Sequence, residues 1–153
     1  MKMQKITPFL WFDGNAEEAA RFYVSVFRNA KMGDVFRTGE NQPALTVSFE
    51  LEGLRFTALN GGPQFKFTEA VSFYVNCESE EELDYYWAKL TEGGAASMCG
   101  WLKDRFGLSW QIIPEEMIAM FGDKDRDKAN RAMQAMMQMQ KIDLPALRKA
   151  YNG

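Results

Sequence analysis

Histidine is absent from all 153 residues of the chain. This absence excludes metal sites built from imidazole ligands and every reaction that uses a histidine as acid or base. Only two cysteines are present, Cys77 and Cys99, which is too few for a disulfide framework or a zinc site. We therefore expect both to be free thiols. Without a histidine neighbour, neither is a good candidate for a nucleophile.

Long apolar runs, glycine-rich phosphate loops and clustered basic charge are also missing. No apolar run approaches the roughly 18 residues that a membrane helix needs, and no G-x-G motif occurs. The net charge is −3 and the basic residues are scattered, so we expect neither nucleic acid nor a membrane surface as a partner. The first residues lead into a strand-like stretch without a signal-cleavage pattern, and we expect a cytoplasmic protein.

The first half of the chain has the pattern of a small α+β unit. An aromatic-rich strand is followed by Asn15, which we expect to cap a helix with Glu17 and Glu18 in its first turn. Three further strands follow, separated by polar turns. The predicted strands cover residues 6–12, 31–37, 44–51 and 54–59.

The second half repeats this order. A strand at residues 70–75 leads to Ser79, the expected cap of a second helix. The segment WLKDRFGLSWQIIP, residues 101–114, then predicts a strand, a tight turn over residues 104–107 and another strand, because apolar residues alternate on both sides of the turn. This segment carries one long amide side chain, Gln111, whose direction matters for function.

The repeat is visible in the letters of the two helices. The motif N-x-E-E-x-x-x-F-Y at Asn15 matches S-x-E-E-x-x-x-Y-W at Ser79, an offset of 64 (79 − 15), and Phe9 falls on Phe73 at the same offset. A chain that repeats strand, helix, strand, strand, strand describes two similar modules. We expect one α+β domain, residues 1–153, with βαβββ modules at residues 4–63 and 68–114.

A helical tail, residues 115–153, follows the second module. Helices are predicted at residues 115–121 and 123–140, and Asp143 is expected to cap a last helix at residues 144–151. Six of the ten methionines lie in this tail, which indicates adaptable packing against a sheet, an edge or a second subunit. The tail either completes the core or acts as a lid over a ligand. Its predicted apolar stripe consists of Ala129, Met133, Met136 and Met137.

The two modules, the motif PFLWFDGNAEEAARFY at residues 8–23 and the closing CGWLKDRFGLSWQIIP at residues 99–114 resemble the vicinal oxygen chelate superfamily, also called glyoxalase-like. Within it, they are similar to the PhnB-like branch that is often labelled 3-demethylubiquinone-9 3-methyltransferase. We take the resemblance to cover essentially the whole chain, including the methionine-rich tail. It implies two βαβββ modules that curl around a concave cavity.

The resemblance also implies positions for metal ligands. Metal-dependent members use one residue from the first strand and one from the last strand of each module, usually histidine and glutamate. These positions fall on Pro8 and Thr57 in the first module, and on Ala70 or Ser72 and Gln111 in the second. None of these side chains is an anionic or imidazole ligand, so we expect no metal and no cofactor.

Alternation places a set of polar side chains on the strand faces opposite the residues that pack against the helices. Glu50 is the only carboxylate among them and is the candidate acid or base, unless it is a solvated residue or is paired with Arg55 on the next strand. The predicted ligand-binding residues are Ser48, Arg55, Thr57, Ser72, Tyr74 and Gln111. The remaining members of the polar set are Thr46, Asn76 and Ser109.

Three functions follow from these residues and from the resemblance. The first is a metal-free protein, expected to be a homodimer, that binds a small polar or mixed organic molecule. The second is an enzyme that uses Glu50 with Tyr74 or Gln111 for proton transfer. The third, a methyltransferase, is disfavoured because the chain lacks the glycine-rich loop that commonly holds nucleotide-type methyl donors.

Overall fold

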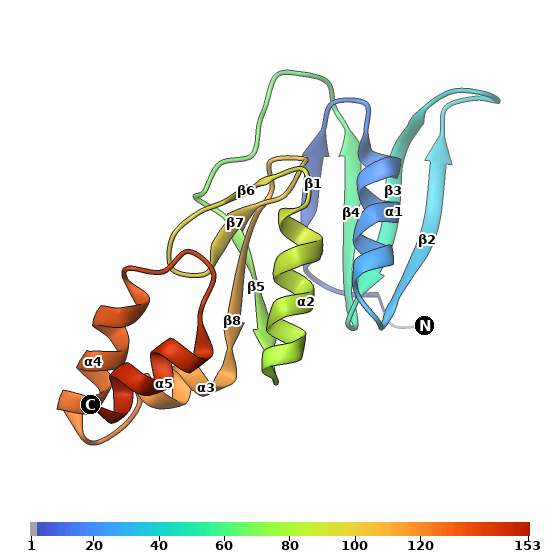
Figure 1. Cartoon of the computed structure of the whole chain (residues 1–153). Helices are drawn as coiled ribbons and strands as arrows, with labels where there is room; N and C mark the ends of the chain where they lie inside the picture. The colour runs from blue at the N-terminus through green and yellow to red at the C-terminus, as the bar shows by residue number, and fades with distance from the viewer. Residues whose placement is uncertain (1–2) are drawn as a thin grey trace. The chain divides into compact units, whose positions relative to one another are not determined.

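The computed structural model describes residues 3–153. The described chain divides into two compact units, with the boundary between Phe67 and Thr68. Each unit contains one four-stranded sheet, and both have the predicted order of strand, helix, strand, strand, strand (Figure 1). The expected α+β fold with two βαβββ modules and C-terminal helices is therefore confirmed. No helix in the described part of the chain is long and apolar enough to cross a membrane.

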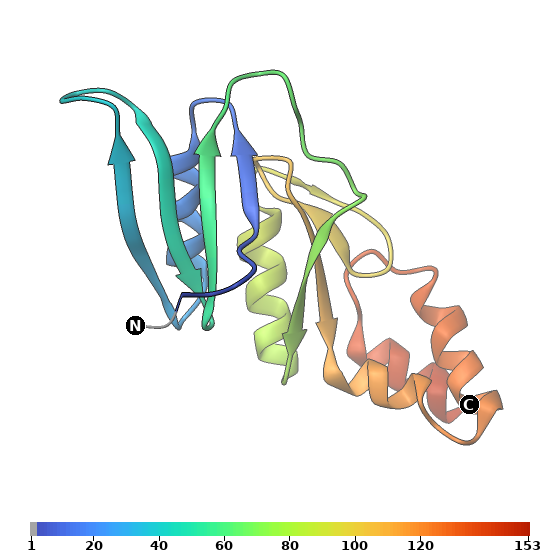
Figure 2. The same ribbon diagram turned by 180° about the vertical axis from the view of Figure 1, so that it is seen from behind.

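The first unit builds its sheet from four strands and covers one face with a helix. Strand β1 runs parallel to β4, and the pairs β4–β3 and β3–β2 are antiparallel, so the order is β1-β4-β3-β2. Helix α1 lies against one face, as Figures 1 and 2 show from opposite sides. The elements are β1 (Phe9–Phe12), α1 (Ala16–Val26), β2 (Ala30–Arg37), β3 (Ala44–Leu51) and β4 (Leu54–Asn60).

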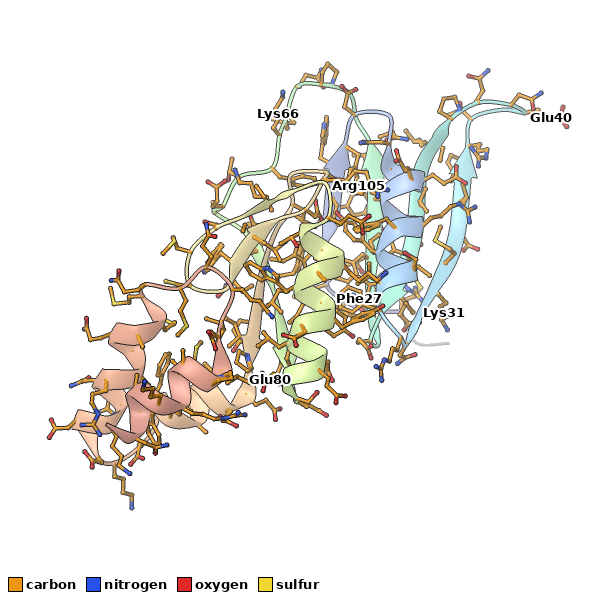
Figure 3. All side chains as sticks on the ribbon, viewed as in Figure 1. Phe27, Lys31, Glu40, Lys66, Glu80 and Arg105 are labelled. Atoms are coloured by element: carbon orange, nitrogen blue, oxygen red, sulfur yellow. The ribbon has the colours of Figure 1, made fainter. Side chains whose placement is uncertain are left out.

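The core of the first unit forms between α1 and the sheet. The helix buries Ala19, Tyr23 and Val26, which are spaced at three and four residues, as one face of a helix requires. On the sheet, alternate residues of each strand face this helix. The buried sheet residues include Leu10, Phe12, Val47, Phe49, Leu51, Phe56 and Ala58. Glu40 lies at the tip of the β2–β3 hairpin, away from this core (Figure 3).

The start of α1 differs from the prediction. Asn15 occupies the N-cap position, but its side chain makes no capping hydrogen bond. The Asn60 side chain, at the end of β4, replaces it: its Oδ1 accepts from the Ala16 N–H at 2.9 Å, and its Nδ2 donates to the Ala44 carbonyl at 2.8 Å. One amide thus joins the helix to two strands, a long-range contact that local spacing does not reveal.

The second unit repeats the arrangement. Its sheet order is β5-β8-β7-β6, with β5 parallel to β8 and the other pairs antiparallel. Helix α2 buries Leu83, Tyr86 and Leu90, and Ser79 caps it by accepting from the Glu82 N–H at 3.1 Å, as predicted. Glu80 marks the first turn of α2 in Figure 3. The elements are β5 (Ser72–Cys77), α2 (Glu80–Thr91), β6 (Ala95–Ala96), β7 (Trp101–Lys103) and β8 (Ser109–Pro114).

The predicted turn over residues 104–107 joins β7 to β8 and depends on Asp104. This carboxylate is only 2% exposed. Its Oδ1 accepts from the N–H groups of Phe106 and Leu108 at 2.9 and 3.1 Å, and its Oδ2 accepts from Trp110 Nε1 at 2.9 Å. Gly107 closes the turn with a φ of +89°, a conformation that glycine adopts without strain. Asp104 therefore fixes the geometry of the hairpin.

Three helices follow β8: α3 (Glu115–Phe121), α4 (Arg126–Met136) and α5 (Leu144–Asn152). The expected cap of the last helix is confirmed, because Asp143 accepts from the Ala146 N–H at 3.1 Å. Helix α4 is shorter than predicted, since Asp125 caps its start. The predicted apolar stripe of this helix was wrong in including Met137, which lies beyond the end of α4 and is 51% exposed. The residues of α4 that are buried are Ala129 and Ala132.

The segment between α4 and α5 attaches the tail to the loop before β7. The N–H of Cys99 donates to the Met139 carbonyl at 2.7 Å, and the N–H of Gly100 donates to the Gln140 carbonyl at 2.8 Å. Ile142 is only 1% exposed and contacts the same loop at Gly100. The tail therefore completes the core of the second unit at this point, which is the first of its two predicted roles.

Candidate functional site

In each unit, the sheet face that the helix does not cover carries most of the polar side chains predicted to form the site. We call this the helix-free face. On the first sheet, cross-strand register places Phe9, Thr57 and Ser48 side by side in one row. The next row contains Arg55, Glu50 and Lys31. The sequence-predicted residues Ser48, Glu50, Arg55 and Thr57 thus share one face of one sheet.

Glu50 forms an ion pair on this face. Its Oε2 lies 3.2 Å from Lys31 Nζ, and Arg55 is its registered neighbour on the other side. The Glu50 side chain is 30% exposed, so water screens this pair. Figure 3 shows Lys31 on β2. This environment favours the interpretation of Glu50 as a charge-paired surface residue, with Lys31 as a partner that the sequence analysis did not anticipate.

Aromatic side chains border the same face, and the sequence analysis did not assign them to the site. Trp11 Nε1 donates to the Gly62 carbonyl at 2.9 Å, and the Phe65 ring meets Trp11 edge-on with ring centroids 4.9 Å apart. This hydrogen bond and this ring contact hold the segment after β4 against β1. Phe9 and Phe65 remain largely exposed. The sequence pattern that could have predicted this aromatic border is the pair of aromatic residues at alternate positions, Phe9 and Trp11.

On the second sheet, one row contains Tyr74, Gln111 and Trp101, and the next contains Ser72, Ser109 and Lys103. Gln111 links the two rows, because its Nε2 donates to Ser72 Oγ at 3.0 Å. The structure thus brings together the three predicted residues Ser72, Tyr74 and Gln111. Tyr74 is 49% exposed. Partial burial raises the pKa of its phenol, so the group is neutral at physiological pH and can donate a hydrogen bond.

A cavity of about 410 Å³ opens beside these rows. Ser109 is one of the residues that line it, but the residue is only 1% exposed. Its Oγ is buried and has no hydrogen-bond partner within residues 3–153. An ion pair between Lys103 and Glu69 lies in the same wall. Lys103 holds the pKa of the Glu69 carboxyl below its usual range. The cavity is lined by Glu69, Ala95, Ala96, Ser97, Trp101, Leu102, Lys103 and Ser109.

The register corrects the predicted equivalence of the first strands. Phe9, not Pro8, lies beside Thr57, and Tyr74 lies beside Gln111. Pro8 precedes β1, where a residue without an N–H is tolerated. The strands β1 and β5 therefore correspond at an offset of 65 (74 − 9), whereas the helices correspond at 64, because the second strand-to-helix loop is one residue shorter.

These positions do not fit a divalent metal ion. Phenylalanine, threonine, tyrosine and glutamine supply no carboxylate or imidazole ligand. Within residues 3–153, no group of three or more histidine, cysteine, aspartate or glutamate side chains is arranged to hold a metal. Cys77 is buried, and desolvation raises the pKa of its thiol to about 12, which disfavours the thiolate that metal binding or nucleophilic attack requires.

Two βαβββ units with these strand orders form the glyoxalase-like fold, and several solved structures share it. The PhnB protein from Bacillus cereus is 38% identical, with a TM-score of 0.68, and the match covers 72% of this chain and 99% of that one. Protein PA1353 from Pseudomonas aeruginosa is 21% identical, with a TM-score of 0.59, covering 73% and 98%. The fosfomycin resistance protein FosX from Listeria monocytogenes shares the fold at 16% identity and a TM-score of 0.50, covering 72% and 90%.

Residues 4–113 match the sequence profile of the family described as 3-demethylubiquinone-9 3-methyltransferase, and the chain belongs to that family. No curated protein matches the chain. The family match ends at Ile113, immediately before the tail. The expectation that the resemblance includes the methionine-rich tail was therefore wrong: helices α3, α4 and α5 lie outside the matched region.

Proposed function

We propose that this protein binds a small polar or mixed organic molecule on the helix-free sheet faces, without a metal ion. The observation that carries the proposal is the hydrogen bond from Gln111 to Ser72 beside the half-exposed Tyr74. Neutral groups of this kind orient a ligand by hydrogen bonds, and ordinary binding sites combine a few such groups with apolar and aromatic walls. Ser48, Arg55 and Thr57 extend the proposal to the first sheet.

The chemistry of Gln111 supports a ligand contact. One N–H of its amide is used by Ser72, which fixes the orientation of the side chain. The amide also has a second N–H and a carbonyl oxygen, so it can donate to and accept from the same ligand. Tyr74, one strand away, adds a phenol that stays protonated at neutral pH. The pair therefore suits a ligand with both carbonyl and hydroxyl or amine groups.

The geometry of Glu50 favours a protein that binds its ligand without converting it. A catalytic base must reach a substrate proton, but the Glu50 carboxylate is engaged by Lys31 and partly solvated. The enzyme hypothesis, Glu50 with Tyr74 or Gln111, has a direct test in Glu50→Gln. An enzyme would lose turnover and keep its affinity for substrate, whereas a binding protein would keep its affinity with no turnover to lose.

The methyltransferase activity in the family's name is a separate hypothesis. The strand-to-helix turns of this chain end in Asn15 and Ser79, and neither provides the glycine-rich loop that commonly cradles a nucleotide-type methyl donor. Calorimetry with S-adenosylmethionine addresses the hypothesis directly, and we expect no heat of binding.

The proposed function is tested with protein purified from an untreated cell extract. Native mass spectrometry should detect a co-purified small molecule, and ligand-observed NMR with a library of small polar fragments should detect binders. Gln111→Ala should weaken this binding about tenfold, the value of one to two lost hydrogen bonds. Gln42→Ala, an exposed glutamine in the β2–β3 loop, is the matched control. Equal binding by both variants, or no binder at all, would refute the proposal.

We also propose that the protein is a homodimer, as expected from the superfamily and the methionine-rich tail. Sedimentation should give about twice the 17.5 kDa mass of one chain. A single species at the mass of one chain would contradict this.

A further inference from the structure

We propose that Asn60 is a site of spontaneous deamidation, that the folded first unit suppresses the reaction, and that the modified residue destabilises this unit. The site is the dipeptide Asn60-Gly61 at the end of β4. Asparagine reacts fastest when glycine follows it, because glycine has no Cβ to shield its backbone nitrogen. The inference goes beyond the proposed function and does not depend on it.

The fold requires both residues of this reactive pair. The Asn60 amide uses both of its polar atoms, since Oδ1 accepts from the Ala16 N–H at 2.9 Å and Nδ2 donates to the Ala44 carbonyl at 2.8 Å. A carboxylate supplies the acceptor but not the donor. A Cβ at position 61 would lie 2.4 Å from the Trp11 indole, so a larger residue than Gly61 would displace that ring. Two separate packing requirements therefore place a labile dipeptide at this point.

The reaction needs only water in addition to these two residues. The backbone nitrogen of Gly61 attacks the side-chain carbonyl carbon of Asn60 and loses its proton. A new C–N bond closes a five-membered succinimide ring, the C–N bond of the side-chain amide breaks, and ammonia leaves with the proton. Water then opens the ring at one of its two carbonyl carbons. The product is aspartate or isoaspartate, and the loss of ammonia makes the change irreversible.

Hydrogen bonds of the folded unit oppose the first step. The Gly61 N–H donates to the Phe12 carbonyl at 2.9 Å, which directs the attacking nitrogen towards β1. The two bonds of the Asn60 amide hold the side chain towards α1 and β3. Attack requires the side chain to rotate towards its own backbone, so these bonds must first break. Deamidation therefore proceeds only from a locally opened state of the first unit.

Either product weakens the joint between β4, α1 and β3. Aspartate has no N–H donor, so one of its carboxylate oxygens would face the Ala44 carbonyl oxygen and be repelled by it. Isoaspartate adds a CH₂ group to the main chain, which shifts Gly61 away from Phe12. The shift also strains the next anchor of this segment, the bond from Trp11 Nε1 to the Gly62 carbonyl at 2.9 Å. A modified first unit is thus less stable than the original.

The test compares the full chain folded in buffer and unfolded in urea, both at mildly alkaline pH. Trypsin releases residues 56–66, in which Asn60 is the one asparagine, and chromatography with mass spectrometry quantifies its conversion to aspartate and isoaspartate. Deamidation should be at least about tenfold slower in the folded protein, because only the opened fraction reacts. Equal rates would show that the fold does not suppress the reaction, and no reaction in urea would show that the pair is not labile. Either result overturns the inference.

Two pairs of variants test the suppression and its consequence. Trp11→Phe removes the hydrogen bond to Gly62 and should speed the deamidation of Asn60 in the folded protein about threefold or more. Trp87→Phe, on α2 of the second unit, should not change this rate. Asn60→Asp reproduces one product and should lower the urea midpoint of unfolding, whereas Asn41→Asp, in the exposed β2–β3 loop, should not. An unchanged rate in Trp11→Phe, or an unchanged midpoint in Asn60→Asp, would contradict the inference.

Discussion

The strongest stability prediction concerns Asp104, which fixes the turn between β7 and β8. Asp104→Ala removes an acceptor from two buried donors, the Leu108 N–H and Trp110 Nε1, and from the partly buried Phe106 N–H. A buried donor left without a partner costs about 1–3 kcal/mol, so the two buried donors imply a loss of about 2–6 kcal/mol. This is a large share of the roughly 5–15 kcal/mol that stabilises a typical domain.

Urea denaturation followed by far-UV circular dichroism measures this loss. Asp34→Ala, which removes an exposed carboxylate on β2, is the control and should change stability by less than about 0.5 kcal/mol. A double-mutant cycle with Trp110→Phe isolates the indole contact: in that background, Asp104→Ala should cost about 1–3 kcal/mol less. A loss below about 1 kcal/mol in the natural background would refute the role assigned to Asp104.

Three further predictions follow from the fold. Asn60→Ala should lower the free energy of unfolding by about 1–3 kcal/mol in chemical denaturation, because it removes the side chain that caps α1. Asn15→Ala should have almost no effect, since the Asn15 side chain makes no capping hydrogen bond. A larger loss for Asn15→Ala than for Asn60→Ala would contradict the observed cap. Iodoacetamide at pH 8 should modify Cys99 well before Cys77, since burial raises the pKa of the Cys77 thiol to about 12; mass spectrometry showing equal rates would contradict this. Gly94→Ala should cost about 3 kcal/mol, because its Cβ would lie 2.1 Å from the Lys103 carbonyl oxygen, and an unchanged denaturation midpoint would contradict that close approach.

The order of the elements was predictable because each module carries strong local signals. Helix caps at Ser79 and Asp143 and the turn ending at Gly107 depend on residues close to one another in the chain, and all three are present. Alternation of apolar residues likewise identified the strands. Local physical chemistry therefore accounts for most of the fold.

The features that the sequence analysis did not predict depend on contacts between residues that are distant in the sequence. Asn60 caps α1 from the end of β4, and Lys31 on β2 pairs with Glu50 on the neighbouring strand β3. The spacing of residues along the chain predicts neither contact. The position of Pro8 was misjudged for a related reason. The offset of 64 holds for the helices, but a one-residue difference in the strand-to-helix loop shifts the first strands to 65. Phe9 therefore takes the place beside Thr57 that was assigned to Pro8, whereas Ser72 and Gln111 stay on the predicted face.

The residues of the candidate site could be predicted from the sequence, but the contacts among them could not. Alternation identified Ser72, Tyr74 and Gln111 as sharing a face, and the register confirms that they do. Ser109 belonged to the same polar set, but spacing does not reveal that its hydroxyl is buried without a hydrogen-bond partner among the described residues. Glu69 lies before β5 in a segment without secondary-structure signals, so its pairing with Lys103 was not foreseeable.

The attachment of the tail to the loop at Cys99 and Gly100 has a consequence for how this protein differs from its relatives. That loop leads directly into Trp101, so an appendage that lies outside the family match braces the strand that forms one wall of the cavity. A shortened chain ending after β8 would expose Gly100 and let β7 shift. Removing the tail is therefore expected to alter the β7 wall of the cavity without changing any residue of the two matched modules.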